Sequence, residues 1–170
     1  MKKSVYFAHP FDTWKTELEQ KIADILRERG YDVVNPLDKE NCLNEKYGVF
    51  GYYEQPSLPF AHDIVKYDFE MLTACDEYFG WLPKGITIVG TVVEMIWACR
   101  QGKPVTVLSY KPNPFLLVYS DKFFASLEDF IKNHPSWIRN NPKDPDAAYY
   151  FGIKERKSTF VTPILGEGKK

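Results

Sequence analysis

The first part of the chain follows the order strand, helix, strand. Residues 4–8 form a short apolar run that ends at a His-Pro pair, which is typical of a buried strand. After Asp12 or Thr13, either of which can cap a helix, apolar residues recur at helical spacing as far as Gly30. Residues 31–35 predict a second strand. Two strands joined through one helix by short links are typical of a parallel sheet.

The same alternation continues through the rest of the chain, with apolar periodicity separated by turn residues. We expect a helix from Ala61 to Leu72, a strand over residues 75–82, a helix from Val92 to Gly102, a strand over residues 104–108, a fifth strand over residues 115–119 and a helix around residues 127–131.

Residues 38–59 interrupt this alternation, because they combine Asn, Gly and Pro with several aromatic residues and show no clear period. A loop of this length in a compact domain is usually functional or mobile, so its aromatics can either cover a pocket or pack the loop down. At 170 residues the chain has the length of one domain. We expect an α/β core over residues 1–134 with an inserted loop at 38–60, and a C-terminal extension over residues 135–170.

The composition is that of an ordinary globular protein, with 44% hydrophobic and 26% charged residues. The net charge of -1 offers no basic surface for nucleic acid, and no apolar run is long enough to span a bilayer. The 3 cysteines and 3 histidines are scattered, which argues against a disulfide framework and a metal site. We therefore expect a cytoplasmic protein that binds neither nucleic acid nor membrane and holds no metal.

Glu94 is the one acid in the apolar run of the helix after Gly90. A carboxylate near a helix N-terminus is stabilised as an anion, and an ionised carboxylate can act as a nucleophile. The motif Thr91-x-x-Glu94 is also a capping box, in which each side chain bonds the backbone of the other residue. On this motif alone, capping is the better interpretation.

The loops that follow the first and third strands are expected to meet at one edge of the sheet. Parallel sheets bind ligands at the carboxyl ends of their strands, where the strand order reverses. The first strand and its loop carry Tyr6, His9 and Phe11, and residues 85–94 lead to Glu94. A phenol, an imidazole and a carboxylate are therefore expected around one crevice.

Two further acids flank the helix that begins near Ala61. Asp68 shares a face with apolar residues, and a buried acid needs a partner or a function. It is either a second carboxylate facing Glu94 or an acid bonded to backbone N–H groups. Asp76 lies where this helix gives way to a strand, which favours a capping or turn role.

Several common catalytic and nucleotide-binding motifs are absent from the sequence. It contains no G-x-G-x-x-G, no G-K-[ST] and no G-x-S-x-G. The first two absences argue against a dinucleotide fingerprint and a P-loop, and the third argues against a serine hydrolase.

The sequence carries five short motifs, which in chain order are Tyr6-Phe7-Ala8, Asp68 in YDFEML, Ala74-Cys75-Asp76, Gly90-Thr91-x-x-Glu94 and Gly102-Lys103-Pro104-Val105. This ordered set resembles the nucleoside 2-deoxyribosyltransferase family, which also holds the deoxynucleoside 5'-monophosphate N-glycosidases. The resemblance covers residues 4–108. It implies a flavodoxin-like fold, that is, a three-layer α/β sandwich around a parallel sheet of about five strands. It also implies no cofactor and no metal, and a homo-oligomer, a dimer or higher, whose sites lie near subunit contacts.

The resemblance also implies roles for individual residues. Glu94 would attack C1' of a deoxyribose and form a glycosyl ester, which then passes the sugar to another base. Asp68 and Tyr6 would complete the catalytic set. The expected partners are a nucleoside or nucleotide and a free base. The residues expected to bind substrate are His9, Phe11, Asp76, Gly90 and Thr91.

Two departures from the family pattern keep other functions open. Ile88 stands where the transferases carry an acid, and the loop at residues 9–12 differs from the Gly- and Ser-rich phosphate loops of the monophosphate hydrolases. Hydrolysis of a nucleoside or its 5'-monophosphate is therefore the first alternative to transfer. A nucleotide-binding module without turnover is the second, because fold does not fix function.

Overall fold

The computed structural model describes residues 2–38, 58–86 and 88–138, which all lie in one compact unit, Met1–Ile138. Most of the expected inserted loop and nearly all of the C-terminal extension lie outside the described residues. The strands are β1 (Ser4–Ala8), β2 (Asp32–Val34), β3 (Glu77–Leu82), β4 (Val105–Ser109), β5 (Lys122–Phe124) and β6 (Trp137–Ile138). The helices are the 3-10 turn η1 (Phe11–Thr13), α1 (Glu17–Glu28), α3 (Leu58–Ala74), α4 (Val89–Arg100), α5 (Pro114–Tyr119) and α6 (Leu127–Ile131).

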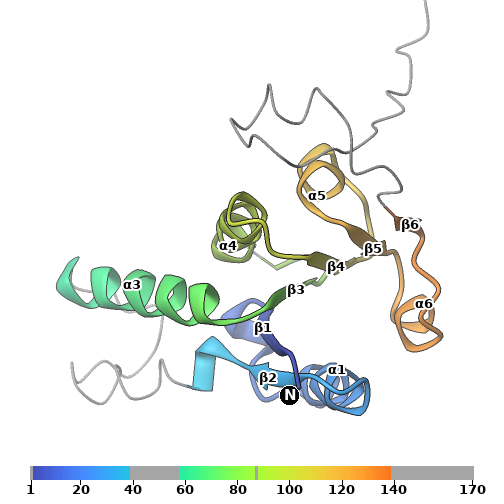
Figure 1. Ribbon diagram of the computed structural model, residues 1–170, viewed down its shortest axis with the longest axis horizontal. Helices are drawn as coiled ribbons and strands as arrows, with labels where there is room; N and C mark the ends of the chain where they lie inside the picture. Colours follow the sequence, from blue (N-terminus) through green and yellow to red (C-terminus); the bar gives the residue numbers. More distant parts are fainter. Residues whose placement is uncertain (1, 39–57, 87, 139–170) are drawn as a thin grey trace, which may run out of the picture. The chain divides into compact units, whose positions relative to one another are not determined.

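The strands form one 6-stranded sheet in the order β2-β1-β3-β4-β5-β6 (Figure 1). All neighbouring pairs from β2 to β5 are parallel, and β6 adds to the edge in the antiparallel sense. The order of the first five strands is that of the flavodoxin-like fold, whose strand order reverses between β1 and β3. The fold class predicted from the sequence is therefore confirmed, although β5 and β6 lie outside the strands expected from the sequence.

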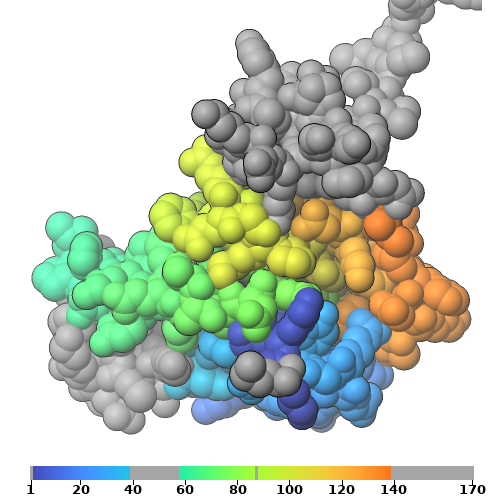
Figure 2. Space-filling view, in the orientation of Figure 1, coloured from blue at the N-terminus to red at the C-terminus, as the bar shows by residue number. Residues whose placement is uncertain are grey.

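The two faces of the sheet are covered by different helices. On one face Val5, Phe7 and Phe79 form a buried cluster with residues of α1 and α6. On the other face α4 packs against β3, and α3 packs along α4 (Figures 1 and 2). Because side chains alternate along a strand, Tyr6 and Tyr78 point towards this second group of helices. The sheet thus separates an apolar core from the face that carries the candidate catalytic residues.

One predicted strand and three predicted helix starts are wrong. Residues 115–119 form α5 instead of a strand, because the Asn113 side chain accepts a bond from the Leu116 backbone N–H (3.0 Å) and Pro114 opens the helix. The third helix begins before Ala61 and includes residues 58–60, which the sequence assigned to the loop. Helix α1 is capped by Thr16, because residues 11–13 form the separate turn η1. Helix α4 begins three residues before Val92.

Among the helices that the structure describes, none combines the length and the hydrophobicity needed to cross a bilayer.

The buried aromatic cluster should dominate the stability of the domain. Phe79 is 1% exposed, and replacing it by alanine leaves a cavity among packed side chains. We expect Phe79→Ala to lower the free energy of unfolding by about 3–5 kcal/mol, measured by urea denaturation. As a control, Leu58→Ala removes a side chain that is 82% exposed and should change stability by less than about 0.5 kcal/mol. Equal effects of the two variants would contradict the assignment of the core.

Candidate active site

Glu94 does not belong to a capping box. Helix α4 begins at Val89 with Ile88 as its N-cap residue, so Thr91 already lies inside the first turn. The Glu94 carboxylate instead accepts a hydrogen bond from the Tyr6 hydroxyl, with 2.8 Å between the phenol oxygen and Oε1. The capping interpretation, which the motif alone favoured, is therefore wrong. The carboxylate is held by the sheet and not by its own helix backbone.

The surroundings of Glu94 change its acidity. Burial disfavours the ionised form and raises the pKa of Glu94 from 4.5 to about 7, although the Tyr6 hydrogen bond acts in the opposite direction. The residue is still partly exposed, so solvent reaches part of it. Near neutral pH the group can therefore exist both as a carboxylate and as a carboxylic acid.

Tyr6 is a donor that does not ionise under ordinary conditions. Its side chain is fully buried, and burial together with the negative charges of Glu94 and Asp68 raises its pKa well above 10. Asp68 comes from α3 and is 9% exposed. The structure thus brings together the three residues that the sequence assigned to catalysis, with both acids close enough to influence one phenol.

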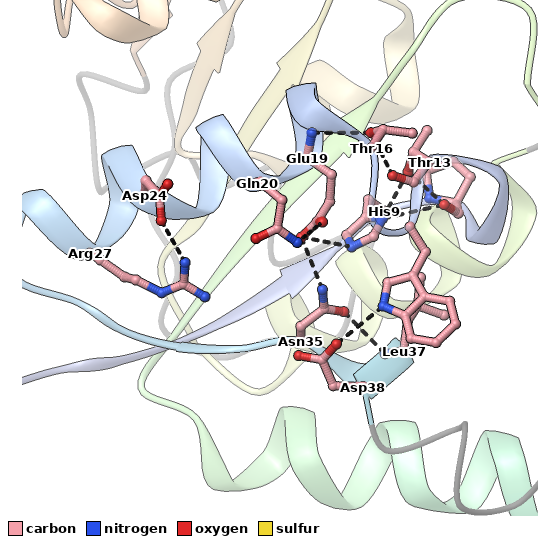
Figure 3. A network of polar contacts seen from close by, with 12 residues as sticks. His9, Thr13, Thr16, Glu19, Gln20, Asp24, Arg27, Asn35, Leu37 and Asp38 are labelled. Carbon is pink, nitrogen blue, oxygen red and sulfur yellow. Dashed lines mark hydrogen bonds and ion pairs between the residues drawn. The ribbon is translucent and has the colours of Figure 1, made fainter.

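His9 lies in a buried polar network and not on an open surface (Figure 3). Its Nδ1 is 2.8 Å from the hydroxyl oxygen of Thr13, and that hydroxyl donates to the Pro10 carbonyl (2.6 Å). The other ring nitrogen, Nε2, lies 3.8 Å from Oε1 of Glu19, a residue that is 1% exposed. Burial lowers the pKa of His9 to about 4, so the ring is neutral at pH 7. His9 therefore holds the loop after β1, and we leave it out of the proposed substrate contacts.

Phe11 and Gly90 are placed where a ligand could reach them. Phe11 is partly exposed in η1 and packs against Trp14, with ring centroids 5.8 Å apart. Trp14 in turn donates from Nε1 to a carboxylate oxygen of Asp38 (3.1 Å). Gly90 is exposed in the first turn of α4, and a Cβ atom built there meets nothing within 4 Å. Their substrate-binding roles stay predictions.

Asp76 and Thr91 both take part in hydrogen bonds that hold the fold together. Asp76 lies just before β3, where its carboxylate accepts bonds from the Ser4 backbone N–H (2.8 Å) and hydroxyl (2.9 Å). These bonds lower the pKa of Asp76 and tie it to the amino ends of the strands, away from the edge at which ligands bind. Thr91 is 5% exposed, and its carbonyl accepts a bond from the Tyr78 hydroxyl (2.7 Å). We include neither in the proposed site.

Tyr78, whose hydroxyl bonds the Thr91 carbonyl, and Gly80, over which the Tyr78 ring lies, were not identified from the sequence. Strand β3 is apolar at nearly every position, so its sequence does not show which side chains share a face. A glycine inside a strand often marks a place where another group approaches the backbone closely. Gly80 is therefore the signal in the sequence that could have indicated this contact.

The aromatic cavity beside α1 and α6 does not lie at Glu94. It measures about 330 Å³ and is lined by Phe79, Phe124 and Phe130 with Arg29 and Glu77 among its polar groups. Glu77 already accepts bonds from Lys3 (2.7 Å) and Tyr31 (2.9 Å), and Arg29 donates to the Phe130 carbonyl. None of Tyr6, Asp68 and Glu94 lines it, so its position does not identify a catalytic site. Within the described ranges no group of three or more potential metal ligands is found.

Comparison with known proteins supports the architecture. No protein-family model matches the sequence, and no curated protein sequence does so either. Among solved structures, the chain is similar to a 2-deoxyribosyltransferase from the psychrotolerant bacterium Bacillus psychrosaccharolyticus, described as a biocatalyst for the synthesis of nucleosides. The TM-score is 0.57 at 22% identity, over 75% of this chain and 90% of that chain. The two chains share a fold. The family resemblance seen in the sequence is thereby confirmed at the level of fold.

The raised pKa of Glu94 predicts a pH-dependent cost to stability. Because the folded state holds this proton up to about pH 7 and an unfolded carboxyl loses it near 4.5, stability should fall as pH rises through this window. Glu94→Gln removes the ionisable group and with it the free-energy cost of ionising a buried carboxyl. At pH 8 we expect the variant to be more stable than the wild type by on the order of 1 kcal/mol, about 2–4 °C in Tm.

The matched control for this prediction is Glu70→Gln, whose side chain is 58% exposed on α3. Thermal unfolding at pH 5 and pH 8 should show a gain at pH 8 only for the Glu94 variant. A gain that is equal at both pH values would mean that Glu94 has an ordinary acidity.

Proposed function

We propose that the protein transfers a 2-deoxyribosyl group between nucleobases through a covalent ester on Glu94. The observation that carries this proposal is the hydrogen bond from the buried Tyr6 phenol to the Glu94 carboxylate, with Asp68 acting on the same phenol. The shared fold with a solved 2-deoxyribosyltransferase supports it. So does the position of β1 and β3 at the point where the strand order reverses.

In the first half of the proposed reaction, a carboxylate oxygen of Glu94 attacks C1' of the deoxyribose. The C1'–N bond breaks, and its electron pair leaves with the base, which takes up a proton. The developing oxocarbenium-like charge is stabilised by the nearby carboxylate. In the second half, a nitrogen of another base attacks C1' and loses its proton, and the ester bond breaks to restore the carboxylate.

Tyr6 fits the role of holding the nucleophile. It donates to Oε1, which leaves the other oxygen for attack and favours the ionised form of the carboxylate. Since the pKa of Tyr6 is itself raised, the phenol stays protonated and keeps this role across the working pH range. We assign Asp68 as the second acid, which gives a proton to the leaving base and recovers it from the incoming one.

Hydrolysis is the second candidate. Ile88 opens α4 at the position where the resemblance places an acid in the transferases, and it makes no side-chain cap bond. If water replaces the second base in the ester-breaking step, the product is the free sugar. The same covalent ester serves both reactions.

A homo-oligomer is also part of the proposal. Seven large hydrophobic residues on α3, α4 and α5 are exposed by 40% or more and are available for subunit contact. They are Leu58, Val65, Tyr67, Val89, Val93, Trp97 and Phe115. Analytical ultracentrifugation should find a dimer or larger species, and a monomer would remove this part of the proposal.

The function is tested by incubating the protein with one 2'-deoxynucleoside and a second free base, followed by chromatography. Transfer gives a new nucleoside, whereas hydrolysis gives free deoxyribose. Glu94→Ala should lower the rate on the order of 10³-fold or more, because the substitution removes the carboxylate that forms the ester. Glu70→Gln should retain the wild-type rate. If purine and pyrimidine deoxynucleosides all stay intact with the wild-type protein, the proposal fails.

The proposed nucleophile also fixes the pH dependence of the rate. Only the ionised carboxylate attacks, and burial raises the pKa of Glu94 to about 7. We therefore expect kcat/KM to rise about tenfold per pH unit below pH 7 and to level off above it. A profile that is flat between pH 5 and pH 8 would exclude Glu94 as the group whose ionisation controls the reaction.

A further inference from the structure

A second phenol holds the helix that carries Glu94. Tyr78 on β3 is 1% exposed, and its hydroxyl donates to the backbone carbonyl of Thr91 in α4, 2.7 Å away. A buried phenol without a partner would be costly, and a helical carbonyl keeps a second lone pair after its bond within the helix. The bond therefore satisfies Tyr78 and fixes the first turn of α4 to the centre of the sheet.

Gly80 provides the room for this ring. A Cβ atom at Gly80 would lie 2.9 Å from both the Cε1 atom and the hydroxyl oxygen of Tyr78, closer than real Cβ atoms approach. Glycine inside a strand weakens it and marks a close approach. Gly80 lies two residues after Tyr78, so the two share a face of the strand, and the tyrosine ring lies over the glycine.

Tyr78 and Tyr6 act on the same helix from neighbouring strands. They are paired in the register of β1 and β3, and their rings are stacked with centroids 6.1 Å apart and planes 19° apart. Their targets, Thr91 and Glu94, are three residues apart and lie on one face of α4. One phenol thus holds the helix through its backbone, and the other holds the carboxylate.

We infer that Tyr78 is a positioning residue: its bond to Thr91 fixes the distance of α4 from the sheet so that the Glu94 carboxylate lies within hydrogen-bond reach of Tyr6. Gly80 contributes by leaving space for the Tyr78 ring. The Tyr78 hydroxyl donates to the Thr91 carbonyl and not to the carboxylate. Tyr78 acts through Thr91, one turn before Glu94, and through the stacked ring of Tyr6. The inference deepens the proposed function and rests on it for its catalytic consequence, whereas its structural consequence can be measured without turnover.

The test compares Tyr78→Phe, Tyr6→Phe and the double variant by carbon-13 NMR titration of the Glu94 carboxyl signal, assigned by its loss in Glu94→Gln. Burial of the carboxylate and the hydrogen bond from Tyr6 on β1 set the pKa of Glu94. The other titratable groups around this pair are Tyr78 on β3 and Asp68 on α3. Tyr6→Phe should raise the pKa of Glu94, because it removes the donor to the ionised form. Tyr78→Phe should shift it in the same direction, because the helix moves away from that donor.

The double variant decides between positioning and general stabilisation. If Tyr78 acts through the Tyr6 bond, the double variant titrates like Tyr6→Phe alone. If Tyr78 only stabilises the fold, Tyr78→Phe lowers Tm and leaves the Glu94 titration unchanged, which overturns the inference. A shift that simply adds to that of Tyr6→Phe also overturns it.

Two further variants complete the design. Tyr31→Phe removes a phenol that donates to Glu77 (2.9 Å) beside the cluster of α1 and α6, and it should leave the titration of Glu94 unchanged. Gly80→Ala pushes the Tyr78 ring aside and should raise the pKa of Glu94 as Tyr78→Phe does. Gly80→Ala and Tyr78→Phe should therefore displace α4 in the same way, so one variant can replace the other if it folds poorly.

The catalytic consequence is read separately. Tyr78→Phe should lower kcat about 10- to 100-fold and leave KM within about twofold, because a misplaced nucleophile slows the chemical step and not binding. If the wild type turns over no nucleoside while the titrations behave as expected, the proposed function fails and the positioning role stands. If turnover occurs and Tyr78→Phe changes only KM, the positioning role fails and the function stands.

Discussion

The hydrogen bond between the Tyr6 phenol and the Glu94 carboxylate is the interaction on which the site depends. A carboxylate in an apolar helix is costly to ionise, and a buried phenol is costly without an acceptor. Bringing them to 2.8 Å lets each offset part of the cost of the other. Because one comes from the sheet and the other from a helix, the bond forms only when the two layers pack correctly. The acidity of Glu94 is thus a property of the whole fold.

The sheet was largely predictable because its strands are short, apolar and bounded by turn residues. The order strand, helix, strand predicted parallel pairing, and the structure has this arrangement from β2 to β5. Boundaries set by single caps were harder to predict. Asn113 starts a helix in residues whose apolar pattern also suits a strand, and Thr16 competes with two other residues able to cap α1. In both places one side-chain bond decides between alternatives of similar pattern.

Within the site, the sequence indicated the two acids and Tyr6 but not Tyr78, which bonds the helix that carries Glu94. Asp68 and Glu94 stand out as acids on apolar helix faces, so their positions alone indicate a special environment. Tyr78 does not stand out, because one tyrosine in an apolar strand gives no sign of the atom it bonds. His9 was expected to face a ligand because it follows β1. The structure shows that its ring is turned into the network with Thr13 and Glu19, which no sequence pattern indicates.

The central claim is that the Glu94 carboxylate forms a bond to a sugar carbon. The most direct measurement is intact mass spectrometry after incubation with a 2'-fluoro-2'-deoxynucleoside, because the fluorine slows breakdown of a glycosyl ester. The account predicts a mass increase equal to the fluorinated sugar, located by peptide mapping on the peptide that contains Glu94 and absent in Glu94→Gln. An unmodified protein that still turns over deoxynucleosides, or a sugar attached to a different residue, would contradict it.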